Sequence, residues 1–513
     1  MKKELYEWQE LCLRRWLANK GRGMVQAVTG SGKTLLALTA AEQIEKTLDA
    51  KLRVKIVVPS SALMRQWHRA LQEFLSDSHE NCQTIGLRGN GHKASQDCKY
   101  MIYVINSARY ELARQILADL KQGNAVLLIA DECHHYATSQ NQLIFEFLPY
   151  IKEYENYFFS LGLSATLPGG QTGRYLKSVL GRKIYTYGIN EAMFQRTISP
   201  YDIYHISLSF EPEENAEYEE LSAQMTFFYQ TLLKACPSLK TLGQTELFEM
   251  LRSLSGSADS KIARAASTYM TLSYKRKSLV ALASARISCA CDLVQRLDKQ
   301  EKIIIFGERI SQADELYQLL QEHMPERVGR YHSKMGSQAN KNVLERFRTG
   351  SVRILIACKA IDEGIDVPDA SVGIILSSTS TKRQRIQRLG RIIRKKDDNA
   401  TASLYYLHIK ATSEDSCFLP DTNQKRLFEL DYDSETRTFI HPAYDQKAEA
   451  LLAQMQDNDI SEEKLQEVKR CLQLGCIRSD WMLDQSDIEE RIQKSRYASD
   501  RNYWICMKKV SKT

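Results

Sequence analysis

The chain has 513 residues, a length that predicts roughly three domains at about 150 residues each. Its content of 43% hydrophobic and 26% charged residues is ordinary for a soluble globular protein, and the net charge of +7 suits a nucleic-acid partner without proving one. No run approaches the roughly 18 apolar residues that span a bilayer. Residues 1–8 lack the apolar core of a signal peptide, so we expect neither a membrane protein nor a secreted one.

A glycine-rich segment near the amino terminus, Ala27–Thr34, separates two different patterns. The short apolar run Met24–Gln26 before it predicts a strand, and Leu35–Leu38 after it predicts a helix. Strand, glycine-rich turn, Lys-Thr and helix form a cradle for phosphate groups, because glycine lets backbone N–H groups turn inward without Cβ clashes. We expect Lys33 to reach the β and γ phosphates of a nucleotide and the Thr34 hydroxyl to ligate Mg²⁺. The predicted nucleotide-binding residues of this segment are Thr29, Gly30, Ser31, Gly32, Lys33 and Thr34.

A continuous apolar run, Ala125–Ala130, predicts a buried parallel strand and ends in two adjacent carboxylates. Such a pair at a strand tip is costly unless it serves a cation. In ATP hydrolysis Asp131 would hold Mg²⁺ through water, and Glu132 would polarise the attacking water. Two ordinary solvated acids are the alternative, and the phosphate cradle argues against it. Ser164 and Thr166 follow at another strand end, where small hydroxyl residues can couple the acids to a neighbouring loop.

The order of these motifs resembles that of superfamily 2 helicases and translocases, most of all XPB-like helicases and the motor subunits of type I and type III restriction enzymes. The resemblance runs from about Tyr6 to about His408, and the family's phosphate loop also begins with Ala, as at Ala27. It implies that Gln9 reads the adenine edge. It also implies that the segments around Val57–Trp67 and Val104–Ser107 hold a nucleic-acid strand by its phosphates. The predicted contacts there are Pro59, Ser60, Arg65 and Ser107.

The second half of the chain carries the remaining motifs in the family's order, starting at the buried-strand pattern Lys302–Phe306. By resemblance, His332 and Cys358 lie on the nucleic-acid side, although relatives often carry Ser or Thr at the position of Cys358. Gly364 and Asp366 belong to a loop that touches both nucleotide and nucleic acid in the family. We expect these two residues on the ATP side.

A basic run near residue 390 resembles the family's arginine-finger helix, which begins here with Gln387. Arg391 and Arg394 lie three residues apart, on one helical face. From the second domain they would meet the γ-phosphate held by the first, where a planar, permanently charged guanidinium suits the transition state. A solvated basic face is the alternative. The predicted catalytic residues are Lys33, Glu132, Gln387, Arg391 and Arg394.

The fold predicted from the alternation of strand-like and helical runs is α/β, with two tandem RecA-like parallel-sheet domains. We expect an ATP-binding domain over residues 1–209 and a second RecA-like domain over residues 277–412. Residues 210–276 form a helical insertion, and residues 413–513 form an accessory, mainly helical and basic region. Ligands of such sheets bind at the carboxyl ends of the strands, where the motifs lie.

Two regions leave alternatives open. XPB-like relatives often carry a helical insertion that grips DNA at the position of residues 210–276, and a helical spacer packed on the second domain is the alternative. The last stretch of the chain interleaves cations with aromatic rings, the composition of a single-strand grip. Partner docking or plain surface is the alternative, and we favour it for this stretch. Its residues are Arg491, Lys494, Arg496, Tyr497, Arg501, Tyr503, Trp504, Lys508, Lys509 and Lys512.

These patterns predict an ATP-dependent DNA helicase or translocase that uses ATP and Mg²⁺. The alternatives are an ATP-gated nucleic-acid clamp that does not unwind, and an RNA helicase. The sequence shows no convincing nuclease constellation, so a nuclease or defence-system partner is an open expectation for a restriction, phage-defence or repair system. The 12 cysteines have poor metal-ligand spacing, and we expect them to be reduced thiols of a cytoplasmic protein.

Overall fold

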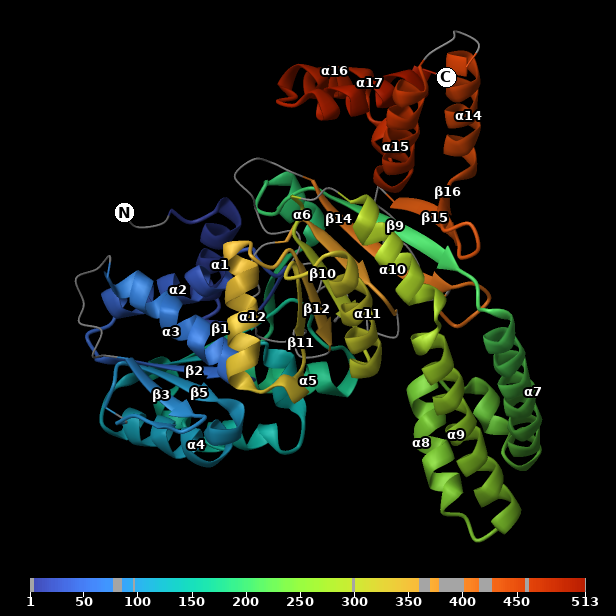
Figure 1. The fold of residues 1–513 in the computed structure, drawn as a ribbon. Helices are drawn as coiled ribbons and strands as arrows, with labels where there is room; N and C mark the ends of the chain where they lie inside the picture. Colours follow the sequence, from blue (N-terminus) through green and yellow to red (C-terminus); the bar gives the residue numbers. More distant parts are fainter. Residues whose placement is uncertain are drawn as a thin grey trace. The chain divides into compact units, whose positions relative to one another are not determined.

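The computed structural model describes residues 4–76, 85–95, 97–297, 300–358, 370–377, 401–414, 427–456 and 461–512 (Figure 1). The chain divides into two compact units. The first is made mainly of residues 1–200, and the second mainly of residues 201–359 and 403–513. Each unit is built around its own mostly parallel sheet.

The first unit is an α/β domain whose sheet has the strand order β4-β3-β5-β2-β6-β7-β1-β8. Every pair is parallel except β3 with β4. The inner strands β5 and β6 are buried along their whole length, which is why they read as continuous apolar runs. The strands are β1 Arg22–Ala27, β2 Leu52–Val58, β3 Ile85–Gly89, β4 His92–Lys93, β5 Tyr100–Val104, β6 Ala125–Asp131, β7 Phe158–Ser164 and β8 Lys183–Tyr187.

Helices cover both faces of this sheet. The helices α4 and α5 pack on the face that carries Tyr103 and Leu128, whereas α2 contacts β2, and α3 contacts β5. Loops at the carboxyl ends of β1, β2, β6 and β7 therefore meet along one edge, because these strands are parallel neighbours. The helices are α1 Glu7–Ala18, α2 Lys33–Thr47, α3 Ser61–Ser76, α4 Ile105–Lys121, α5 Gly170–Leu180 and α6 Ile189–Phe194.

The second unit contains a sheet of order β11-β12-β10-β13-β14-β9-β15-β16, in which β16 runs antiparallel to β15. Its strands are β9 Tyr201–Leu208, β10 Ile303–Gly307, β11 Val328–Tyr331, β12 Ile354–Cys358, β13 Val372–Ile375, β14 Ala402–Ile409, β15 Leu427–Asp433 and β16 Thr438–Ile440. The helices α10 Ala285–Arg296, α11 Ile310–His323 and α12 Ser337–Thr349 belong to the same unit. Together the two sheets confirm the predicted pair of RecA-like domains.

One strand lies in a different sheet from the one that the sequence predicts. We assigned residues 1–209 to the first domain, but β9 pairs in parallel with β15, with Leu427 opposite Ile203 and Asp431 opposite Ser207. The division of the chain accordingly falls between Pro200 and Tyr201. An apolar run predicts a strand but carries no information on which sheet it joins.

The insertion is helical, as predicted, and consists of α7 Pro212–Ala235, α8 Gln244–Ser255 and α9 Ser260–Leu282 (Figure 1). These helices pack against one another around small cores of their own, centred on Leu232, Leu251 and Leu272. By length and composition, the described residues include one stretch apolar enough to cross a membrane, 260–296, and 67% of its most apolar window is buried within the protein.

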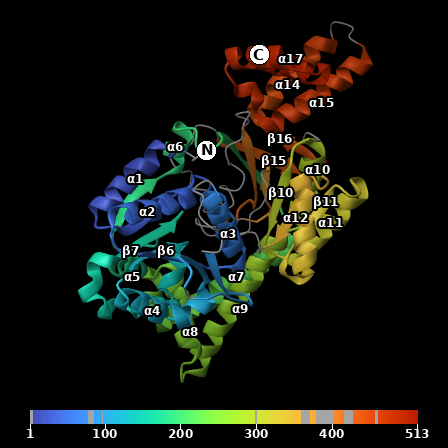
Figure 2. The same cartoon turned by 90° about the vertical axis from the view of Figure 1, so that its left-hand side faces the viewer.

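The C-terminal hundred residues share a core with the second sheet. Figure 2 shows the helices α14 Pro442–Gln456, α15 Glu462–Arg478 and α17 Ala498–Lys512 close together. The helix α16 Gln485–Lys494 precedes α17 and lies beside it (Figure 1). Tyr405 of β14 donates a hydrogen bond to the Ile477 carbonyl at 3.0 Å, and Met507 lies in the same apolar cluster. The region that we predicted as accessory therefore continues the second unit, while its boundary at residue 413 stays a prediction.

Candidate active site at the edge of the first sheet

The glycine-rich segment turns sharply between β1 and α2, as the sequence predicts. Gly30 has φ +86° and Gly32 has φ +92°, values in the left-handed region that favours glycine. A Cβ on Gly32 would also lie 2.6 Å from the Gln9 side-chain nitrogen, so a side chain here would displace Gln9. The Ser31 hydroxyl donates to the Val28 carbonyl at 2.7 Å and closes the turn. The loop therefore leads directly into the amino end of α2. The backbone N–H groups at the amino end of a helix favour the binding of anions.

Lys33 connects this loop with the acids of β6. Its ammonium donates to the Ala27 carbonyl at 3.0 Å, and its charge also acts on the Asp131 carboxyl. The Thr29 hydroxyl is buried and has no hydrogen-bond partner among the described residues. An unpaired buried hydroxyl in a phosphate cradle suits a polar ligand, because leaving it unpaired costs free energy.

Asp131 is a buried carboxylate with both oxygens held. It is 7% exposed at the end of β6. The Trp67 indole donates to Oδ2 at 2.8 Å, and the Glu132 backbone N–H donates to Oδ1 at 3.0 Å. Burial, and next the charge of Glu132, raise the pKa of Asp131 from 3.8 to about 6, against the opposing effects of Trp67 and Lys33. A nearby cation would therefore stabilise the ionised Asp131 carboxylate.

Glu132 begins a chain of contacts that runs to the end of β7. It adopts φ 46° and ψ 50°, a left-handed conformation that is uncommon for a residue with a side chain. Its carboxylate lies 3.4 Å from Nδ1 of His134, and that nitrogen shares a 2.8 Å hydrogen bond with the Ser164 hydroxyl. Ser164 in turn accepts from the Thr166 backbone N–H at 3.1 Å. The structure thus brings the predicted base and the two predicted coupling residues together, through a histidine.

Gln9 is fully buried against the phosphate loop. Its side-chain nitrogen donates to the Gly32 carbonyl at 2.9 Å, and its side-chain oxygen accepts from the Tyr6 backbone N–H at 2.8 Å. The side chain therefore ties α1 to the loop. Its recognition of adenine stays a prediction.

The predicted nucleic-acid contacts of the first unit lie around the loop after β2 and the start of α4. The Ser60 hydroxyl accepts from the Leu63 backbone N–H at 3.3 Å and caps the start of α3. Pro59 is half-buried before it, and Arg65 is exposed on α3. Ser107 is half-buried on α4, close to the backbone of β3. Their binding to a nucleic acid stays a prediction.

The corresponding residues of the second unit are buried, and their binding to a nucleic acid stays a prediction. His332 is 5% exposed, with Nε2 3.2 Å from Asp314, and Cys358 is 3% exposed at the end of β12. Buried side chains are poor candidates for direct contact with phosphates. The other residues predicted to act in this half of the chain lie outside the described residues. They are Gly364, Asp366, Gln387, Arg391 and Arg394.

The residues at this edge fit a magnesium nucleotide. Thr34 and Asp131 offer hard oxygen donors, which Mg²⁺ prefers. Among the described residues, no cluster of three or more His, Cys, Asp and Glu could hold a metal ion. That is compatible with Mg²⁺, because the ion usually takes one or two carboxylates together with substrate phosphates and waters.

Two aromatic residues of this site have roles that the sequence did not indicate. Trp67 was predicted to belong to the nucleic-acid segment, but it is 1% exposed and faces Asp131. The Tyr136 hydroxyl lies 2.6 Å from the Asp131 carbonyl and 2.8 Å from the Val57 carbonyl. The apolar spacing along α3 would have placed Trp67 on the buried face, but no signal named Asp131 as its partner.

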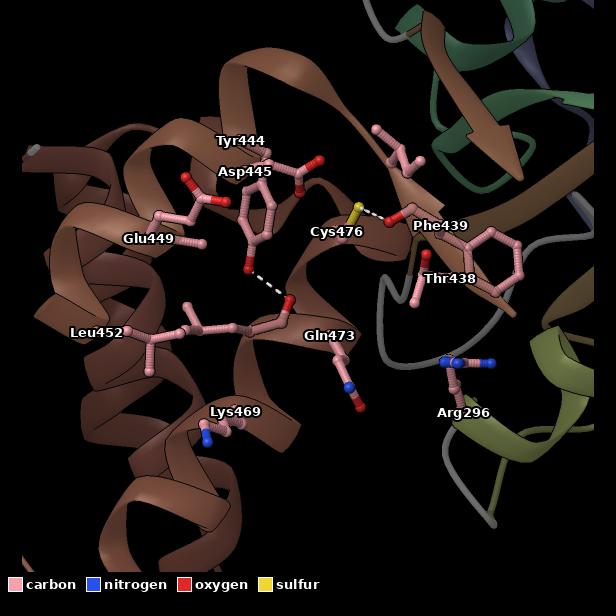
Figure 3. A pocket seen from close by; sticks show the side chains of 13 residues that line it. Arg296, Thr438, Phe439, Tyr444, Asp445, Glu449, Leu452, Lys469, Gln473 and Cys476 are labelled. Carbon is pink, nitrogen blue, oxygen red and sulfur yellow. Dashed lines mark hydrogen bonds between the residues drawn. The ribbon is translucent and has the colours of Figure 1, made fainter. Parts of the chain in front are cut away.

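A separate cavity of about 310 Å³ lies in the second unit, between β16, α14 and α15 (Figure 3). Its wall is mostly apolar, and Asp445, Glu449 and Lys469 lie around it. Tyr444 donates to the Leu472 carbonyl inside the wall. None of the residues predicted to bind nucleotide or nucleic acid lines this cavity.

Comparisons with known proteins agree with this site. The family model of the type III restriction enzyme res subunit matches residues 2–169, and the helicase conserved C-terminal domain matches residues 285–396. The chain is 28% identical over 402 residues to the DNA 3'-5' translocase XPB2 of Sulfurisphaera tokodaii, which covers 77% of this chain and 80% of that protein.

Two solved structures show a similar fold. One is the Hef helicase domain of Pyrococcus furiosus, with a TM-score of 0.51 and 15% identity over 80% of this chain and 97% of that one. The other is the ATP-dependent type ISP restriction-modification enzyme LlaBIII bound to DNA. Its TM-score is 0.53 at 12% identity, and the match covers all of this chain and 40% of that enzyme. At such low identity these two likenesses concern the fold alone.

Proposed function

Because the chain belongs to the superfamily 2 helicases and translocases, which hydrolyse ATP, we propose that it converts ATP hydrolysis into movement along DNA. The observation that carries this proposal is the similarity to a DNA translocase, which extends over 77% of the chain. A clamp that does not unwind, and an RNA helicase, are less favoured.

The residues of the first unit divide the work of hydrolysis. Bound Mg²⁺, held by Thr34 and Asp131, would neutralise charge on the phosphates. Lys33 and the backbone of the glycine-rich loop would hold the β and γ phosphates. Glu132 would accept a proton from the attacking water. The resulting change of charge on Glu132 would act on His134 and, through the hydrogen bond of His134, on Ser164.

The choice between DNA and RNA is tested by stimulation of the ATPase. We expect single-stranded, duplex or forked DNA to raise the hydrolysis rate more than RNA of the same sequence. The stimulation should weaken as salt rises, since phosphate contacts release counterions. ATP hydrolysis is measured across this panel of ligands at two salt concentrations. Equal or greater stimulation by RNA would favour the RNA-helicase alternative.

A strand-displacement and translocation assay separates a motor from a clamp. We expect ATP to drive movement, and the non-hydrolysable analogue to support binding only. An ATPase that is stimulated by DNA, yet moves no strand and travels along no duplex, would favour the clamp.

Removing the Ser164 hydroxyl should uncouple hydrolysis from movement. We expect Ser164→Ala to keep most of the DNA-stimulated ATPase but to lower the translocation rate about tenfold. A factor of this size lies within the usual range of coupling between two sites. The physical reason is the loss of the 2.8 Å hydrogen bond to His134, which links the base to the end of β7. Both rates are measured on the same preparation.

A second serine on the same strand provides the matched control. Ser160 is fully buried, and its hydroxyl donates to the Leu180 carbonyl at 2.9 Å, away from the acids. Ser160→Ala should change both rates in proportion, if at all. A proportional fall of both rates in Ser164→Ala as well would speak against a coupling role.

Two broader features complete the proposal. We place the protein in the cytoplasm, because the scattered spacing of its 12 cysteines is typical of reduced thiols. We also propose that it works as the motor of a restriction, phage-defence or repair system, in which a separate partner would supply any nuclease activity. The similarity to restriction-enzyme res subunits over residues 2–169 supports this.

A further inference from the structure

The helix α3 has one face in the core and one in solvent. Its buried side chains are Leu63, Met64, Trp67, Leu71 and Leu75. Arg65 and Arg69 are exposed on the other side of the helix. The helix begins directly after Ser60, which caps it. One element thus carries a predicted nucleic-acid contact and a side chain that reaches the ATP site.

The contact between Trp67 and Asp131 fixes the direction of a carboxylate. The indole nitrogen lies 2.8 Å from Oδ2, and Oδ1 accepts from the backbone N–H of Glu132 at 3.0 Å. With one donor on each oxygen, the carboxyl group cannot rotate without breaking a hydrogen bond. Trp67 itself is packed at 1% exposure, so its indole has little freedom to follow.

A second contact, made by Tyr136, joins β2 and β6. The Tyr136 hydroxyl lies 2.8 Å from the Val57 carbonyl at the end of β2 and 2.6 Å from the Asp131 carbonyl at the end of β6. It holds the backbone, whereas Trp67 holds the carboxylate. The position of the Asp131 side chain therefore depends on α3. The position of its main chain depends on β2, the strand that leads into α3.

We propose that Trp67 is the positioning residue of the magnesium carboxylate, and that α3 transmits nucleic-acid binding on its outer face to the metal side of the ATP site. The second half of this proposal rests on the proposed function. A helix moves as a rigid body, so a displacement that starts at Arg65 also displaces Trp67. Outer-shell partners of metal ligands act in this way, by orienting the ligand.

The test measures binding of a fluorescent non-hydrolysable ATP analogue as Mg²⁺ is titrated. In Trp67→Phe, the Mg²⁺ concentration that gives half of the maximal increase in analogue binding should rise about 10- to 100-fold. Substitution of a residue that orients a metal ligand usually has an effect of this size. Binding of the analogue without Mg²⁺ should stay at the wild-type level. An unchanged Mg²⁺ requirement in Trp67→Phe would overturn the positioning role.

Trp16 offers a control of the same chemistry. It is 1% exposed, and its indole donates to the Ser160 carbonyl at 3.0 Å, in the same unit but not to an acid. Trp16→Phe removes a buried indole hydrogen bond without touching Asp131. Its Mg²⁺ requirement should match that of the wild type. A rise equal to that of Trp67→Phe would show a general loss of packing, and would overturn the proposal.

The coupling half is read from the same titration with saturating DNA. In the wild type, DNA should shift the Mg²⁺ requirement, and in Trp67→Phe this shift should vanish while DNA affinity without nucleotide is kept. A shift of equal size in the variant would overturn transmission through Trp67. If DNA does not bind the wild type, the proposed function fails on the DNA side. If DNA binds the wild type but does not shift its Mg²⁺ requirement, transmission through α3 is overturned and the proposed function stands. The Mg²⁺ titration without DNA still decides the positioning role.

A readout in the wild-type chain avoids any loss of folding in the variant. The sequence has only five tryptophans, so 5-fluorotryptophan gives five fluorine resonances, and Trp67→Phe identifies one of them. That resonance should move when Mg²⁺ is added to the analogue complex, and should move again when DNA binds. A Trp67 resonance indifferent to Mg²⁺ would overturn the proposal.

Discussion

Replacement of Glu132 by Gln should lower the rate of ATP hydrolysis by a factor of about 10² to 10⁴, the usual contribution of a general base. The amide keeps the shape of the side chain but cannot accept a proton from water. The backbone at Glu132 is held in a left-handed conformation beside Asp131, so the substitution should leave the loop in place. Nucleotide affinity should therefore persist, or rise because the complex no longer turns over.

The measurement is steady-state ATP hydrolysis in the presence of DNA, beside binding of a fluorescent ATP analogue. Glu153→Gln makes the same chemical change at an exposed acid of the same unit and should retain the wild-type rate. Wild-type activity in Glu132→Gln would refute the assigned base. Loss of both hydrolysis and binding would instead indicate damage to the phosphate cradle.

Replacement of Arg286 by Met should destabilise the second unit by about 3–5 kcal/mol, the cost of breaking a buried ion pair from one side. Arg286 is fully buried on α10. Its guanidinium donates to the carbonyls of Val280 at 3.0 Å and Leu407 at 2.8 Å, and also to the Leu376 carbonyl and the Glu414 carboxylate. Four separate segments therefore lose a donor at once, and the buried Glu414 carboxylate loses its ion pair with Arg286.

This prediction is checked by urea unfolding of the full chain, with the transition of the second unit followed by a probe placed there. The double variant Arg286→Met with Glu414→Gln should recover part of the loss. It also removes the carboxylate charge that Arg286 balances, and the amide oxygen of Gln can still accept from the Ile409 backbone N–H, as Glu414 does at 3.0 Å. Arg348→Met, at an exposed arginine, should stay within about 0.5 kcal/mol of the wild type. A loss below 1 kcal/mol in Arg286→Met would contradict the structural role.

The residues that form the phosphate cradle could be predicted because their geometry is local. Gly30 and Gly32 stand where the backbone needs positive φ, and Lys33 begins the helix that follows. The run that became β6 was equally clear, because a strand buried on both faces is apolar at every position. Because β6 and β1 run parallel, its two acids lie at the same edge of the sheet as the loop after β1, with β7 between the two strands.

Other parts of the site depended on contacts between distant residues. Trp67 and Asp131 are far apart in the chain, and only the pairing of β2 with β6 brings α3 over the acid. The burial of His332 and Cys358 likewise follows from the packing of the second unit, which the local sequence pattern does not show.

The sequence by itself determined the chemistry of this protein: a phosphate loop, two acids at a strand end, and their order along the chain. These features are readable because each depends on backbone preference and apolar spacing within a few residues. The tertiary structure decided which sheet β9 joins, that the last hundred residues continue the second core, and which side chain aims the Asp131 carboxylate. Those outcomes depend on which apolar surfaces bury one another, and many pairings of surfaces are compatible with the same local pattern.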